Sequence, residues 1–210
     1  MLSLASLLAF TGVAVAMVMT PGPNMAYLVS RSIAQGPAAG LVSLVGVATG
    51  LVSYMLLAAF GITAVLLAVP LAYDAIRFAG AAYLAWMAWN AFRPGGRSPF
   101  QVRRLSVDSP RKLYLMGLLT SLLNPKIAAL YLSLLPQFID KTHGSILAQT
   151  LELGAVQIVC SVVGNSIWIV TAGSVTRFLT RRPFWAKAQR WLMGTVLGLL
   201  ALRMATDAGR

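Results

Sequence analysis

Charged residues are scarce in this sequence, and acidic ones are the scarcest. Only 10% of the 210 residues are charged, and Asp and Glu together number five, whereas about 25% of a typical soluble domain is charged. So few charges cannot cover a water-facing surface. The composition is 58% hydrophobic, with a mean hydropathy of +0.77, and uncharged runs of about 20 apolar residues are typical of membrane spans. We therefore expect an all-α membrane protein.

Cysteine and histidine are almost missing as well. Cys160 is the single cysteine and there is one histidine, which excludes an internal disulfide and a multi-cysteine metal site. An intramembrane enzyme would need a nucleophile, metal ligands or paired acids at depth, so we predict that the protein is not an enzyme. A metal-cation exporter of similar architecture stays open as an alternative, although hard cations require clustered carboxylates and soft ones Cys or His. We predict no metal and no cofactor.

Long apolar runs predict six membrane-spanning helices. They cover residues 2–29, 38–69, 76–92, 113–135, 146–178 and 191–205. A polar run rich in Gly, Pro, Ser and Arg divides them, so we predict a first three-helix half (1–92), a linker (93–112) and a second three-helix half (113–210). An odd number of spans in each half predicts oppositely inserted halves, which is the inverted repeat of many secondary transporters. No positive region precedes the first apolar run, so we do not expect a cleaved signal peptide.

Basic residues gather on one side of the predicted spans. Most of the 17 Lys and Arg residues, Arg31 included, fall in the linker and in the loops on the linker side. The positive-inside rule then places the linker in the cytoplasm and both termini outside. The formal net charge of +12 raises the alternative of nucleic-acid binding. Basic residues that flank spans instead indicate topology and contacts with anionic lipid head groups, so we expect no nucleic-acid partner.

Helix-breaking residues interrupt the first and fourth predicted spans. Residues 20–25 read TPGPNM and residues 124–126 read NPK. Proline removes an N–H donor and clashes with the carbonyl one turn earlier. The freed backbone groups each cost several kcal/mol in hydrocarbon unless protein, water or a ligand satisfies them. Breaks at corresponding places in two halves point to a transport site, and a proline kink without a ligand is the alternative.

Each break also carries the signal for a new helix. Thr20-Pro21 and Asn124-Pro125 both place an N-cap residue before a proline at the first helical position, and Asn24 offers a second cap. A half-helix that begins at such a break directs free N–H groups toward the membrane interior, where they suit a carboxylate. We therefore predict that both breaks contact the substrate.

Lys126 is the most informative single residue. An ammonium deep in a span costs about 2.5–3.5 kcal/mol on insertion scales, so it usually marks function. The alternative is a lysine that binds backbone carbonyls freed by Pro125. Glu152, near the start of the fifth span, is the candidate for proton coupling, and the alternative is an interfacial residue in contact with water.

Three further polar or aromatic residues are candidates for a cavity wall. Gln157 and Asn165 are eight residues apart and share a helix face, where they line a cavity or bond a neighbouring helix. Tyr83 belongs either to a cavity wall or to an aromatic belt at the membrane interface.

Three segments of the chain resemble the LysE/RhtB family of amino-acid exporters. They are TPGPNM, GAAYLAWMAWNAFR at 80–93 and LLNPKIAALYLSLLPQF at 122–138. The resemblance covers nearly the whole chain, the linker least. It implies a small bacterial inner-membrane protein that acts as a homodimer and exports amino acids or their derivatives in exchange for protons. The family's motif positions, which we take as substrate-binding residues, are Pro21, Gly22, Pro23, Asn24, Asn124, Pro125 and Lys126.

Overall fold

The computed structural model describes residues 2–68, 70–93, 107–142, 144–181 and 183–206, and within these ranges helices are the only regular secondary structure. The first half contains α1 (Leu4–Met19), α2 (Pro23–Gln35), α3 (Pro37–Ala68) and α4 (Pro70–Phe92). The second half contains α5 (Pro110–Leu122), α6 (Pro125–Ala129), a π-helical turn η1 (Leu130–Leu134), a 3₁₀ turn η2 (Leu135–Phe138), α7 (Ile146–Arg181) and α8 (Pro183–Thr206). Six of these helices begin with proline. Proline suits the first helical position because its missing N–H would have no partner there.

Up to four parts of the described chain are candidate membrane spans. Among the described residues, α3 and α7 are each long and apolar enough to cross a membrane. Two bent pairs bring the number of candidate spans to four: α1 with α2, at 51°, and α5 with Pro125–Phe138, at 46°. The first and fourth predicted spans are therefore broken, as the TPGPNM and NPK motifs predicted. The chain is an all-helical, multi-pass membrane protein.

Some predicted boundaries differ from the structure. The first span does not end at Val29, because α2 continues to Gln35 and carries Arg31 inside the helix rather than in a loop. Ser109 caps α5 by accepting a hydrogen bond from the Lys112 N–H, so the last residues of the predicted linker are helical. Linker residues 94–106 lie outside the described part of the chain.

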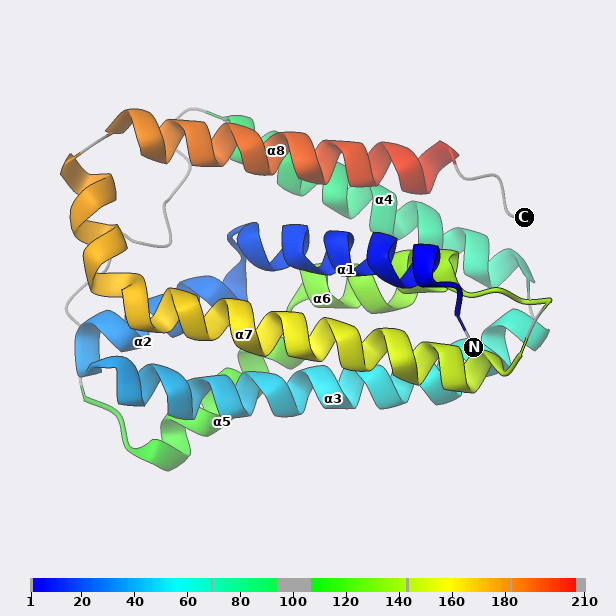
Figure 1. Cartoon of the computed structure of the whole chain (residues 1–210), viewed down its shortest axis with the longest axis horizontal. Coiled ribbons are helices and arrows are strands. Elements are labelled where there is room, and N and C mark those ends of the chain that lie inside the picture. The colour runs from blue at the N-terminus through cyan, green and yellow to red at the C-terminus, as the bar shows by residue number, and fades with distance from the viewer. Residues whose placement is uncertain (1, 69, 94–106, 143, 182, 207–210) are drawn as a thin grey trace.

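The helices run roughly parallel along the long axis of the molecule (Figure 1). The long helices α3 and α7 pack together, α4 packs along α8, α1 packs on α7, and α5 packs on α3. The backbones of α3 and α5 approach closely, because a Cβ on Gly46 or Gly117 would overlap a carbonyl oxygen of the facing helix. Such small-residue contacts are typical of helix packing in membranes.

Different helix ends lie at the two ends of the molecule. α1 begins and α8 ends at one end, whereas the α2–α3 junction and the start of α5 lie at the other (Figure 1). The two breaks lie between these ends. They are surrounded by a buried core that includes Phe10, Leu28, Leu51 and Tyr131.

Candidate functional site

The first break separates α1 from α2 by three non-helical residues. Thr20 is the C-cap of α1, and its hydroxyl donates to the Ala16 carbonyl (2.8 Å) instead of capping the next helix. The prediction that Thr20 is an N-cap is therefore wrong. The N-cap of α2 is Gly22, with Pro23 at the first helical position and no side chain bonded to that end. A residue before proline avoids helical backbone angles, so two prolines delay the restart until Pro23.

The second break is capped as the sequence predicted. Asn124 is the N-cap of α6, and its Oδ1 accepts a hydrogen bond from the Lys126 N–H at 3.0 Å. On the other side of the break, the Tyr54 hydroxyl of α3 donates to the Leu122 carbonyl at the end of α5 (2.8 Å). Side chains therefore satisfy backbone groups on both sides of this break.

Lys126 belongs to the second break but binds the first. It is 6% exposed, and its Nζ donates to the carbonyls of Met17 (2.7 Å) and Thr20 (2.6 Å). These carbonyls lie at the C-terminal end of α1, where backbone acceptors lack helical partners and the helix dipole favours a cation. The alternative interpretation of Lys126 was a lysine that binds backbone carbonyls freed by Pro125. The ammonium does bind free backbone carbonyls, but they belong to the first break and not to the segment beside Pro125.

Gly22 leaves room for this lysine. A Cβ built on Gly22 would lie 3.1 Å from Lys126 Nζ and 3.3 Å from its Cε. The backbone of Gly22 is extended, with φ −155°, a conformation that any residue adopts. A Cβ at this position would therefore press on the lysine side chain, whereas the backbone conformation would tolerate it.

A small cavity lies where the two breaks meet. It is lined by six of the predicted candidates and five other residues: Gly22, Asn24, Asn124, Lys126, Gln157 and Asn165, together with Met17, Val18, Met25, Ile127 and Ser161. Its volume is about 20 Å³, room for one or two water molecules. Residues from α1, α2, α6 and α7 thus line one cavity with a partly polar wall inside a largely apolar protein.

One side-chain amide atom of Asn24 and one of Asn124 have no hydrogen-bond partner in this cavity. Asn24 is 6% exposed and Asn124 is 1% exposed, and neither Asn24 Oδ1 nor Asn124 Nδ2 is bonded. An unsatisfied buried polar group costs about 1–3 kcal/mol. One free acceptor and one free donor at the same point are therefore a mark of a ligand site.

The other candidates lie away from the cavity lining. Pro21, Pro23 and Pro125 set the helix ends but do not line the cavity. Tyr83 is half-buried on α4, where its ring contacts Trp86 (centroids 5.5 Å apart). Glu152 is exposed on α7 and is not among the residues that line the cavity.

The sequence reasoning missed Ser161 and Tyr131. Ser161 lies midway between Gln157 and Asn165 on one face of α7, and its Oγ accepts from Asn165 Nδ2 (3.1 Å). Polar residues repeated every fourth position on an apolar helix were the signal for it. The fully buried Tyr131 donates to Gln157 Oε1 (3.0 Å) from the π-helical turn, and no sequence pattern marked this contact.

Comparison with known proteins identifies the family. The sequence profile described as LysE type translocator matches residues 15–208. A leucine efflux protein of Klebsiella pneumoniae is 33% identical, over 92% of this chain and 91% of that protein. A leucine efflux protein of Enterobacter sp. is 31% identical, over 90% of each chain, and the uncharacterized membrane protein YrhP of Bacillus subtilis is 30% identical, over 72% of this chain and 75% of that one. No solved structure gives a significant match.

Proposed function

The chain belongs to the LysE type translocator family, and we propose that it exports a neutral amino acid through the cavity between the two helix breaks. The family and the names of its relatives make it an amino-acid transporter rather than an enzyme. Leucine is the first substrate to test, because two of the relatives above are leucine efflux proteins.

The free amide atoms of Asn24 and Asn124 carry this proposal. A zwitterionic amino acid presents an ammonium donor and a carboxylate acceptor a few ångströms apart. Asn24 Oδ1 is a buried acceptor that lacks a donor, and Asn124 Nδ2 is a buried donor that lacks an acceptor. We assign the substrate ammonium to Asn24 and the substrate carboxylate to Asn124, because this pairing satisfies both groups at once.

Two other features of the cavity favour a carboxylate. α2 begins at the cavity with no side-chain cap, so its positive dipole end is available to an anion. Lys126 has three N–H donors, of which two bind Met17 and Thr20. The third donor and the positive charge remain for the substrate.

The rest of the lining suits an aliphatic side chain. Met17, Val18, Met25 and Ile127 are apolar, and no acidic residue is among the cavity-lining residues. A second positive charge on lysine or arginine would therefore lack a partner there. Among the described residues, no group of three His, Cys, Asp or Glu could hold a metal ion.

We also propose that the six predicted spans form an inverted repeat. An inverted repeat would pair α3 with α7 and α4 with α8, and both pairs pack together. It would also relate the packing of α1 and α2 on α7 to the packing of α5 on α3, and both contacts are present. The match is incomplete, since α4 also packs on α6 and η1. The basic linker then lies in the cytoplasm and the termini in the periplasm.

The family resemblance supports proton exchange, a homodimer and a place in the bacterial inner membrane as further proposals. Glu152 is the proposed proton carrier to test first, and Glu152→Gln should abolish the dependence of export on a proton gradient. Anionic lipid head groups are the proposed partners of the exposed basic residues on the linker side.

Transport of labelled leucine in proteoliposomes tests the proposed substrate. We expect uptake into leucine-loaded vesicles that unlabelled leucine competes away. 4-Methylpentanoate, which lacks the ammonium, and 3-methylbutylamine, which lacks the carboxylate, should compete at least about tenfold more weakly because each leaves one amide unpaired. Equal competition by either analogue would contradict the assignment of its missing group.

Asn24→Leu and Asn124→Leu test the two amides. Losing one hydrogen bond to a charged group is worth about 1.5–3 kcal/mol, so the apparent affinity for leucine should fall by about 10- to 150-fold. Thr11→Val is the matched control, because the Thr11 hydroxyl bonds only the Leu7 carbonyl of its own helix and lies outside the cavity. Normal affinity in both Asn variants would move the binding site elsewhere.

A further inference from the structure

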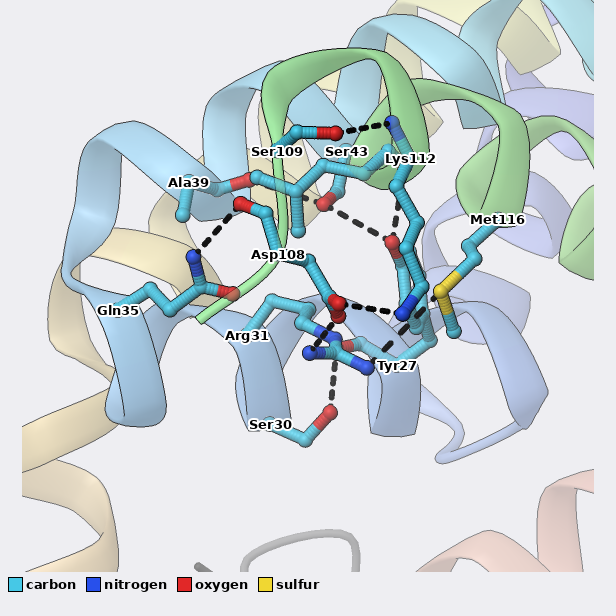
Figure 2. Close-up of polar contacts among 11 residues, drawn as sticks. Tyr27, Ser30, Arg31, Gln35, Ala39, Ser43, Asp108, Ser109, Lys112 and Met116 are labelled. Atoms are coloured by element: carbon cyan, nitrogen blue, oxygen red, sulfur yellow. Dashed lines mark hydrogen bonds and ion pairs between the residues drawn. The ribbon is translucent and has the colours of Figure 1, made fainter. Parts of the chain in front are cut away.

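The end of α2 that lies farthest from the cavity is fastened to the start of α5. Figure 2 shows the Arg31 side chain pointing at Asp108, which directly precedes the N-cap of α5. Arg31 Nη1 forms an ion pair with Asp108 Oδ2, and Lys112 Nζ lies 2.6 Å from Asp108 Oδ1. The Arg31 and Asp108 side chains are 9% and 4% exposed, and that of Lys112 is 58% exposed. The pair with Arg31 is thus buried, while Lys112 joins it from the surface.

Two hydrogen bonds flank this ion pair. The Tyr27 hydroxyl donates to the Leu113 carbonyl (2.8 Å), and Gln35 Nε2 donates to the Asp108 carbonyl (3.0 Å). Tyr27, Arg31 and Gln35 are spaced four residues apart, so they lie on one face of α2. Ser32 lies on another face, where its hydroxyl donates to the Ile169 carbonyl of α7 (2.6 Å). One whole face of α2 is therefore attached to residues 108–113.

The ion pair persists at neutral pH. The hydrogen bond from Lys112 and the charge of Arg31 hold the pKa of Asp108 below its ordinary value, although burial acts in the opposite direction. The guanidinium of Arg31 is always protonated. Losing Asp108 leaves the buried Arg31 charge without its partner, which strongly destabilises the closed arrangement.

α2 connects this ion pair to the proposed binding site. Gly22, Asn24 and Met25 of its first turn line the cavity, and Arg31 is seven residues beyond Asn24, or about 10 Å along the helix. Glycines flank the helix at both ends: Gly22 lies in the break where the chain bends by 51°, and Gly36 has φ +89°, which other residues rarely adopt. α2 is therefore a short helix with a glycine at each end, one of which lies beside the cavity.

The cavity is too small for its proposed cargo. A volume of about 20 Å³ holds one or two water molecules, so helices around it must separate before an amino acid enters. We propose that the Arg31–Asp108 pair is a latch that holds α2 closed over the binding site on the linker side, and that the latch opens when cargo enters from that side. This inference rests on the proposed transport function, and it assigns Arg31 and Asp108 a role in gating rather than in binding.

Thiol labelling in membrane vesicles tests the latch. In a Cys160→Ala background, Ser161→Cys places one thiol in the cavity lining, and a membrane-impermeant reagent reports its exposure from each side. We expect Asp108→Asn to raise the labelling rate from the linker side by about tenfold, because the closed state loses a buried ion pair. Lys112→Ala, which removes only the exposed partner, should change that rate by less than about twofold.

Cross-linking gives a second test, in which a covalent link replaces the ion pair between positions 31 and 108. Arg31→Cys and Asp108→Cys are combined in the Cys160→Ala background. A short bifunctional thiol reagent that joins the two cysteines should block export of leucine, whereas a monofunctional reagent should not. An unchanged labelling rate in Asp108→Asn, or full export by the cross-linked protein, overturns the latch. If Asp108→Asn protein does not accumulate, the cross-linking result decides.

The same vesicles separate the latch from the proposed function. Leucine bound in the cavity should protect the introduced thiol from labelling. Protection by leucine with no effect of Asp108→Asn would refute the latch alone. Neither protection nor transport of leucine would refute the proposed substrate and its site.

Discussion

The two helix breaks look alike in sequence and differ in how their backbone groups are satisfied. At the second break, Asn124 caps α6 and Tyr54 binds the end of α5. At the first break, Lys126 from the other half binds the end of α1, and no side chain caps α2. The helices that follow differ too, because α2 is regular over 13 residues whereas α6 has five and continues into a π-helical turn.

This difference assigns separate roles to the two breaks. The second break is completed within the protein, so it is a fixed support that presents Asn124 and Lys126 to the cavity. The first break keeps the positive end of α2 available, so it suits a ligand, although the two breaks bend the chain by similar angles, 51° and 46°. In a membrane, an uncapped helix end is stable only beside water, protein or a ligand.

Replacing Lys126 should have the largest effect, because it joins the two breaks. Lys126→Met removes two hydrogen bonds from a charged donor, each worth about 1.5–3 kcal/mol, and leaves the Met17 and Thr20 carbonyls unpaired. We expect export to fall to background and the thermal midpoint in detergent to drop strongly. Lys126→Arg keeps the charge and should retain more stability than Lys126→Met.

A lysine elsewhere in the same half provides the control. Lys112→Met removes a 58% exposed ammonium, and exposed ion pairs are worth about 0–1 kcal/mol. Its thermal midpoint should stay close to that of the unmodified protein. If Lys126→Met were as stable and as active as Lys112→Met, the ammonium would not support the first break.

Gly22→Ala should have an intermediate effect that is specific to the first break. The new methyl group would meet Lys126 Nζ at 3.1 Å, and overpacking of this kind typically costs about 1–3 kcal/mol. We expect the KM for leucine to rise, because the lysine is pushed from its carbonyls beside the binding site. Transport kinetics in proteoliposomes measure this change.

Gly12→Ala is the matched substitution in the preceding helix. A Cβ there meets nothing within 4 Å, and alanine favours a helix over glycine by about 1 kcal/mol. Unchanged or slightly higher stability is the expected result. A Gly22→Ala protein that behaved like Gly12→Ala would show that the contact with Lys126 is not limiting.

Tyr54→Phe should have the smallest effect, and on stability alone. It removes the donor to the Leu122 carbonyl but keeps the ring that stacks on Tyr131 with centroids 5.8 Å apart. One neutral hydrogen bond contributes about 0.5–1.5 kcal/mol, so the thermal midpoint should fall slightly while the KM for leucine stays constant. A raised KM would show that the second break also moves during transport.

Local patterns predicted the helix breaks and six of the residues that line the cavity. Asn124 before Pro125 predicted an N-cap that the structure contains, because a cap depends on residues two or three positions apart. The same reasoning was wrong for Thr20, where a second proline at 23 delayed the helix start. Gln157 and Asn165 were found from their shared helix face, and Ser161 between them was overlooked although the same spacing marks it.

Local sequence patterns could not predict contacts between residues that lie far apart along the chain. The partners of Lys126 lie more than 100 residues away along the chain, and the role of Tyr131 depends on a π-helical turn beside α7. Arg31 was counted among the basic loop residues that indicate topology. The structure instead buries it in α2 against Asp108, which no local pattern distinguishes from an arginine in contact with lipid phosphates.

The sequence by itself determined that this is a helical membrane protein with two interrupted spans, because hydropathy and proline act locally on each helix. Only the tertiary structure decided which break remains available to a ligand. That choice depends on where the Lys126 ammonium finds its carbonyls once α6 packs beside the end of α1, and a long flexible side chain acquires a definite partner only when the helices around it are in place.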